Sequence, residues 1–178
     1  TVHAFVDESQ RGSRYYLAAA IVEPARLGPT RRALRALLMP GQREIHFCKE
    51  KPPRQRSVSD AVARLPVKVR IYHRTCGRQN EPARQQCVSA MVRDLLDIDA
   101  RRLVIDSRDE RDMHDQRTLH EALVKRPQES SLVYEHGPST GDALLWIADV
   151  AAWCYGAGGS WRTRINPIIG AVHDGDRP

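Results

Sequence analysis

The chain has 178 residues, of which 41% are hydrophobic, and its mean hydropathy is −0.52. This length suits one globular domain with a substantial core. No apolar run reaches the ~18 residues that a membrane helix needs, which excludes helical membrane spans and predicts no membrane partner. Thr1 begins no signal-peptide pattern, and the four cysteines show no zinc or disulfide spacing. We therefore expect a cytoplasmic protein with reduced thiols.

The formal net charge is +6, and lysine supplies only four of the 28 basic residues, the rest being arginine. Arginine pairs bidentately with phosphate and stacks on bases, so this composition predicts a nucleic-acid partner. A GC-rich genome, which encodes arginine readily, is the alternative explanation. Basic charge indicates a partner only where it clusters on the surface.

The apolar periodicity and the turn residues predict the secondary structure in chain order. The first half contains strands at 2–6 and 15–22 joined by a turn at 10–13, a helix at 30–38, a short strand-like segment at 44–47 and a helix at 58–65. The second half contains strands at 67–72, 102–105 and 132–134, helices at 82–96, 109–124 and 142–155, and a short helix around 165–172. Such interleaving indicates a mixed sheet with helices on its faces. We expect one domain over residues 1–178, with a helical insertion at about 25–65 and a helical tail at about 160–178.

Three aspartates, Asp7, Asp106 and Asp149, each interrupt or end an apolar run. An ionised carboxylate beside a core is costly unless it is paired or bound to a metal. Each has an ordinary alternative: Asp7 as a turn residue, Asp106 as a helix start, and Asp149 as the partner of an arginine. Two predicted strands and a predicted helix each carry one of these aspartates. Together they predict an acidic cluster that holds a cation.

Weaker candidates lie near these acids in the predicted topology. Glu44 and His46 point the same way if their segment is extended, which suits an extra ligand or a general base, although a polar strand edge explains them equally well. Ser9 shares a strand face with Asp7, and Ser139 lies in the turn before the last main helix. Three further acids, Glu8, Asp109 and Asp142, are expected to be structural. The chain has no phosphate-binding loop, dinucleotide fingerprint, nucleophile elbow or zinc-protease motif.

Three short motifs follow this order along nearly the whole chain: Phe5-Val6-Asp7-Glu8-Ser9, Glu44-Ile45-His46 and Leu145-Trp146-Ile147-Ala148-Asp149. With them the chain resembles the RNase H-like fold of ribonucleases H, Holliday-junction resolvases and retroviral-type integrases. More closely, it resembles a prokaryotic family of unknown function with an Asp-Glu-Ser-Gly start, a Glu-x-His segment and a Leu-Gln-x-Ala-Asp helix. Gln10 replaces that glycine and Trp146 replaces that glutamine, which removes a polar side chain near the expected site.

The resemblance implies a three-layer α/β fold with a mixed five-stranded sheet and helices on both faces. It also implies a metal-dependent, nuclease-like phosphodiester hydrolase that uses two Mg²⁺ or Mn²⁺ ions about 3.5–4 Å apart. The expected metal ligands and catalytic residues are Asp7, Asp106 and Asp149, and Glu44 is expected to assist catalysis. Substrate contacts are expected from His46, Lys49, Ser9 and Ser139, and the nucleic-acid backbone is expected near Lys51, Arg54 and Arg56.

Two other functions stay open. The first is a catalytically inactive module that binds nucleic acid through a basic surface. The second is a component that binds a protein partner or a second copy of itself, for example in phage defence or in a mobile element. Neither requires the aspartates to hold a metal.

Overall fold

The computed structural model describes residues 1–107, 112–124 and 132–177. At its centre is a six-stranded sheet with the order β5-β4-β1-β2-β3-β6. The strands are β1 (Val2–Arg11), β2 (Arg14–Val22), β3 (Lys68–Thr75), β4 (Ala100–Asp106), β5 (Val133–Gly137) and β6 (Ile169–Asp174). β1, β2 and β3 pair antiparallel, whereas β4 and β5 run parallel to β1, and β6 runs parallel to β3.

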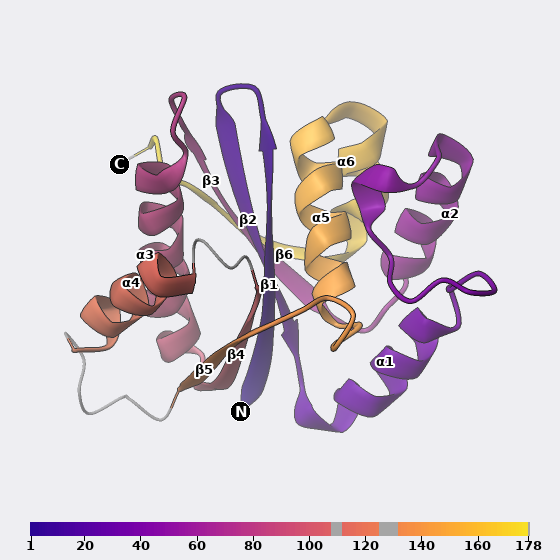
Figure 1. The fold of residues 1–178 in the computed structure, drawn as a ribbon, viewed down its shortest axis with the longest axis horizontal. Coiled ribbons are helices and arrows are strands. Elements are labelled where there is room, and N and C mark those ends of the chain that lie inside the picture. The colour runs from indigo at the N-terminus through magenta and orange to yellow at the C-terminus, as the bar shows by residue number, and fades with distance from the viewer. Residues whose placement is uncertain (108–111, 125–131, 178) are drawn as a thin grey trace.

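Helices cover both faces of the sheet (Figure 1). One face carries α1 (Leu27–Arg35), α2 (Pro52–Val62), α5 (Leu145–Ala157) and α6 (Gly159–Ile165), and the other carries α3 (Glu81–Asp97) and α4 (Asp112–Val124). Three short 3₁₀ turns complete the described elements: η1 (Pro24–Arg26), η2 (Phe47–Lys49) and η4 (Asn166–Ile168). The predicted α/β fold with a mixed sheet and helices on both faces is confirmed. No helix in these three described ranges is long and apolar enough to cross a membrane.

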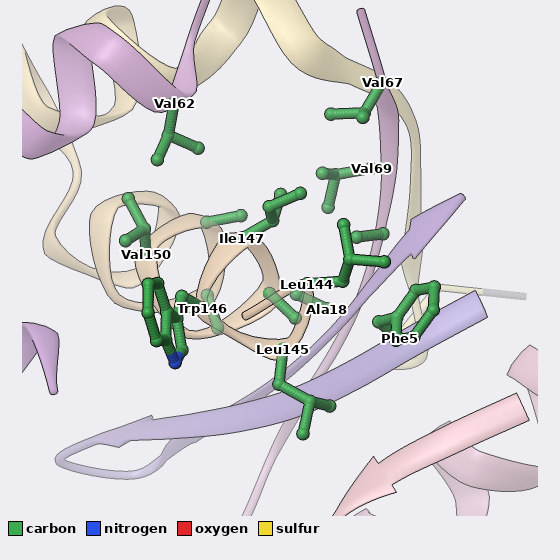
Figure 2. Packing of buried hydrophobic residues seen from close by; sticks show 14 of the residues in the cluster. Phe5, Ala18, Val62, Val67, Val69, Leu144, Leu145, Trp146, Ile147 and Val150 are labelled. Carbon is green, nitrogen blue, oxygen red and sulfur yellow. The ribbon is translucent and has the colours of Figure 1, made fainter. Parts of the chain in front are cut away.

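The alternation of side chains along β1 gives each face of the sheet its own core. Phe5 belongs to the cluster under α5, whereas Ala4 and Val6 belong to the cluster under α3 and α4. α5 is buried almost all round, as its continuous apolar sequence predicts. Figure 2 shows its side chains enclosed by residues of the sheet and of α2. A carboxylate on this helix is therefore held next to a core.

The predicted turn of the first hairpin is shorter than expected. The register pairs Arg11 with Arg14, so only Gly12 and Ser13 connect the strands. Gly12 has a φ of +54°, a backbone conformation that is strained for residues with a side chain. A glycine at this position therefore makes the tight connection possible. As a result β1 continues past Asp7, which pairs with Ala18 inside the sheet instead of ending the strand.

The prediction of five strands and of an entirely helical tail is wrong. α6 and η4 are helical, but the chain then forms β6 beside β3. Pro167 in η4 blocks continuation of the helix, and Gly170 on β6 lies beside the side chain of Lys68 on β3. The edge of β3 supplies the hydrogen-bond partners that a helix would have supplied locally, and the local pattern does not reveal this edge.

Other boundaries move for local reasons. The segment 44–46 forms no strand, and Phe47 begins a 3₁₀ turn, because its amide bonds to a side chain on α5 instead of a neighbouring strand. α2 begins at Pro52, earlier than predicted, since prolines suit the first turn of a helix. α5 begins at Leu145, after Asp142. The predicted helix start at Asp109 lies outside the described residues.

Candidate functional site

A cleft of about 350 Å³ lies between the sheet, α5 and the segment that contains η2. The predicted aspartates, Asp7, Asp106 and Asp149, all line it. Their side chains come from β1, from the end of β4 and from α5. Three segments that are far apart in the sequence therefore place carboxylates around one opening.

Parallel pairing sets the positions of Asp7 and Asp106. The register joins Val6 to Ile105, so the two aspartates follow at the same level of adjacent strands. Asp7 is only 9% exposed, and its Oδ1 accepts a hydrogen bond of 2.7 Å from the amide of Glu8. The strand thus fixes the direction of this carboxylate through its own backbone.

Asp149 is partly buried on the face of α5 that borders the cleft. Its Oδ2 accepts a hydrogen bond of 2.9 Å from the backbone amide of Phe47. Phe47 itself is fully buried, and its carbonyl accepts a hydrogen bond from Gln55 on α2. This arrangement orients the aspartate and anchors the segment that carries His46 and Cys48.

Glu44 is placed beside the cleft rather than in its wall. Its carboxylate accepts a hydrogen bond from the hydroxyl of Ser139, which does line the cleft. The indole Nε1 of Trp146 donates to the carbonyl of Ser139 at 2.9 Å. Trp146 thus supplies a polar contact to the turn, although the residue that it replaces in the related motif is a glutamine. The structure brings Glu44 and Ser139 together at the site's edge.

The predicted substrate-binding residues divide into two groups. Ser9 and His46 line the cleft, and the Nδ1 atom of His46 lies 3.6 Å from the thiol of Cys48. Lys49 is exposed, but it is not among the lining residues. Arg54 was expected near the nucleic-acid backbone, but its guanidinium donates a hydrogen bond to the carbonyl of Leu37 within the protein.

A buried polar network that the sequence did not predict lies on the other side of β1. Glu8 accepts hydrogen bonds from the Tyr15 hydroxyl and from Arg84, the latter at 2.8 Å. Arg84 also forms a two-pronged ion pair with Asp115 on α4, which in turn lies 3.2 Å from Nε2 of His136 on β5. Burial, with the charge of Glu8, raises the pKa of Tyr15 well above its usual value. The network ties β1, which carries Asp7, and β5 to the helices α3 and α4.

The expected structural role of two acids is consistent with these contacts. Glu8 has its buried partners, and Asp142 forms a two-pronged ion pair with Arg31 at 2.6 and 2.9 Å. Asp109 lies outside the described residues. In the sequence, Arg84 is one arginine among many on a helix with mixed polarity, and no local signal marks it as buried.

The donors around the cleft suit a hard divalent cation. Within 1–107, 112–124 and 132–177, no three His, Cys, Asp or Glu side chains are grouped to hold a metal ion by themselves. Mg²⁺ does not need such a cage, because it is commonly held by one or two carboxylates with waters and substrate phosphates. Carboxylate oxygens also favour Mg²⁺ or Mn²⁺ over softer metals. The residues present therefore fit such an ion in the presence of a phosphate substrate.

The four thiols are expected to differ sharply in reactivity. Cys48 is exposed at the cleft, whereas Cys76, Cys87 and Cys154 are buried. Burial raises the pKa of Cys87 and of Cys154 to about 12, which suppresses their thiolate forms. We expect one fast-reacting thiol in a titration of the native protein with a chromogenic disulfide at neutral pH. Cys48→Ser should abolish this fast phase, and a fast phase that survives the substitution would contradict the placement.

Comparisons with known proteins bear on the fold. No family model matches the chain, and no curated protein matches it. Among solved structures, it is similar to RNase HII from Archaeoglobus fulgidus, determined in complex with PCNA, with 16% identity and a TM-score of 0.57. The match covers 86% of this chain and 71% of that one. The family indicated by the three short motifs stays a prediction, but the chain has an α/β fold similar to that of RNase HII.

Proposed function

We propose that this protein is a metal-dependent, nuclease-like phosphodiester hydrolase. One observation carries the proposal: Asp7, Asp106 and Asp149 reach a single cleft from three separate elements. Clustered carboxylates are costly next to a core unless a cation balances them. The RNase HII-like fold supports a nuclease-like chemistry, and the short motifs favour the prokaryotic family of unknown function as its closer relatives.

In this proposal Asp7, Asp106 and Asp149 would hold Mg²⁺ or Mn²⁺, with two ions expected, each bound by one or two carboxylates together with waters and substrate phosphates. Such ions activate water and stabilise the leaving oxygen of a phosphodiester. The backbone amides of Glu8 and Phe47 hold the carboxylates of Asp7 and Asp149 in fixed directions. Carboxylates that are already oriented need little rearrangement when charge develops in the reaction. Such preorganisation is the main source of electrostatic catalysis.

The polar groups around the acids would receive the substrate. Ser9 and His46 line the cleft and can donate to phosphate oxygens. Ser139 is oriented by Glu44, which gives that acid a supporting part in the site. Lys49 is exposed next to these residues and would contact the nucleic-acid backbone outside the cleft.

The proposal is tested by incubating the protein with single-stranded DNA, RNA, duplex DNA and RNA–DNA hybrids. We expect cleavage of at least one substrate with Mg²⁺ or Mn²⁺ and none with a chelator. Asp7→Asn should abolish it, because the substitution removes one of the charges that hold the cation. Asp60→Asn is the matched control, since Asp60 lies on α2 and pairs with Arg164 away from the cleft. Equal behaviour of the wild type and Asp7→Asn on every substrate would end the proposal.

A nucleic-acid-binding module without catalysis is the second candidate. It is favoured by the absence, within the described parts of the chain, of three side chains grouped to hold a metal. The same assay separates the two functions: salt-sensitive binding that is unchanged in Asp7→Asn, without cleavage, supports the module. A protein partner, a second copy of the chain and a cytoplasmic location stay predictions.

A further inference from the structure

Trp153 is the aromatic residue that extends the cleft beyond the acids. It lies one helical turn after Asp149 on α5, so both side chains share a face, and both line the cleft. Its ring meets those of Phe47 and Trp161 in edge-to-face contacts, with centroid distances of 5.1 and 5.2 Å. Neighbouring aromatic rings thus hold this partly exposed indole in place.

Arg11 covers this indole from the hairpin. Its guanidinium carbon lies 4.5 Å from the centre of the Trp153 ring, and the side chain is exposed. Arg11 shares a face of β1 with Asp7 and Ser9, because side chains alternate along a strand. The strand therefore runs from the acidic site to the Arg11–Trp153 pair on one side of the sheet.

Three other arginines lie over aromatic rings, but each is engaged elsewhere. Arg162 donates to the carbonyl of Tyr155, and Arg164 is paired with Asp60. Arg31 is paired with Asp142. Within the described residues, Arg11 forms no such ion pair or hydrogen bond through its guanidinium, so its charge and the face turned away from Trp153 are available to a ligand.

The separation between the pair and the acids suits a strand of several nucleotides. Asp7 and Arg11 are about 13 Å apart along β1 at ~3.3 Å per residue. Asp149 and Trp153 are about 6 Å apart along α5 at ~1.5 Å per residue. A stacked strand advances ~3.4 Å per nucleotide, so about two to four nucleotides span this distance. A mononucleotide would reach either the acids or the Arg11–Trp153 pair, but not both.

We propose that Arg11 and Trp153 form a platform that binds a base and its phosphate in a single nucleic-acid strand, a few nucleotides from the acids. The proposal takes its ligand class from the proposed function. A guanidinium can stack on a base with its planar face and can pair with phosphate through its N–H groups. The Trp153 indole, which other aromatic rings hold in place, supports the opposite face of the guanidinium. Stacking tolerates any base and either sugar, so the platform selects for strand length rather than sequence.

The test measures binding of labelled thymidine oligonucleotides of one to six residues to the full chain, in a chelator so that no cleavage occurs. The wild type is expected to gain affinity up to about four nucleotides. Arg11→Ala should lose about tenfold on the longer strands, the scale of one stacked base, and should lose most of this dependence on length. Arg11→Lys keeps the charge and is expected to recover only part of the affinity. Oligouridine in a parallel series shows whether RNA binds in the same way.

Arg93→Ala is the matched control, because it removes the same charge from an exposed arginine on α3, across the sheet. This variant should change the affinity by less than about twofold, because its surface charge lies away from the acids and from the Arg11–Trp153 pair. Trp153→Leu gives a second test, with thermal unfolding to show that the fold survives, and Trp153→Phe should restore part of the binding. Equal losses in Arg11→Ala and Arg93→Ala would overturn the platform.

The outcome also separates this inference from the proposed function. Asp7-dependent cleavage together with wild-type binding by Arg11→Ala removes the platform and leaves the nuclease. Arg11-dependent binding without cleavage of any substrate leaves the platform and removes the nuclease. Absence of both binding and cleavage overturns both.

Discussion

Arg84→Ala should destabilise the protein by about 3–5 kcal/mol, the usual cost of removing one member of a buried ion pair. Its side chain is 3% exposed, and its partners Glu8 and Asp115 are 6% and 3% exposed. Burial lowers the pKa of Arg84, but the charges of Glu8 and Asp115 outweigh this and raise it, so the guanidinium stays charged. Without it, the buried carboxylates of Glu8 and Asp115 would both lose the guanidinium that pairs with them.

Urea unfolding of Arg84→Ala and of Arg164→Ala measures this difference. Arg164 also pairs with an aspartate, but the side chains of that pair are 31% and 44% exposed. An exposed pair contributes about 0–1 kcal/mol, so Arg164→Ala should unfold almost like the wild type. Similar free energies of unfolding for the two variants would show that the network of Arg84 is not a major source of stability.

Asp149→Asn should lower the rate of the proposed metal-dependent cleavage by on the order of 100-fold or more, because the proposed reaction uses the charge that is lost. Its stability should change by less than about 1 kcal/mol, since the amide oxygen of asparagine still accepts the hydrogen bond from Phe47. The substitution separates the charge of Asp149 from its structural contact.

Asp149→Ala removes both the charge and the acceptor. The Phe47 amide would then lose its partner next to a buried ring, at a cost of about 1–3 kcal/mol. Rates of cleavage and urea unfolding of both variants check the two effects, with Asp60→Asn as the control for charge alone. Full activity in Asp149→Asn would remove Asp149 from the reaction while leaving its contact with Phe47 intact.

The sequence predicted the parts of this site that depend on local patterns. The apolar runs before Asp7 and Asp106 identify two strands, and the apolar helix around Asp149 identifies a buried helix, so the three acids could be assigned to elements. That they line one cleft follows from the parallel pairing of β1 with β4 and from the packing of α5 on β1. The topology expected from the resemblance brings the three elements to one cleft, and the role of the acids there stays a prediction.

The elements that were missed depend on distant partners. β6 exists because the edge of β3 is open to it, and the segment before Phe47 is fixed by Asp149 rather than by a strand. Arg84 is buried because Glu8 and Asp115 meet it from two other elements. A spacing rule along the chain contains none of this information, since each case requires residues more than 30 positions away.

Asp7 and Glu8 are consecutive residues that both line the cleft, but their side chains lie on opposite faces of β1, and the carboxylate of Glu8 belongs to the buried network. Because side chains alternate along β1, the register with β2 and β4 decides which acid faces which way. A slip by one residue would exchange the two carboxylates, leaving Arg84 without Glu8 and the cleft with a longer side chain. The hairpin that fixes this register therefore also opposes misfolded forms: a chain with the two acids exchanged would lack Asp7 on the cleft face and the buried ion pair between Arg84 and Glu8.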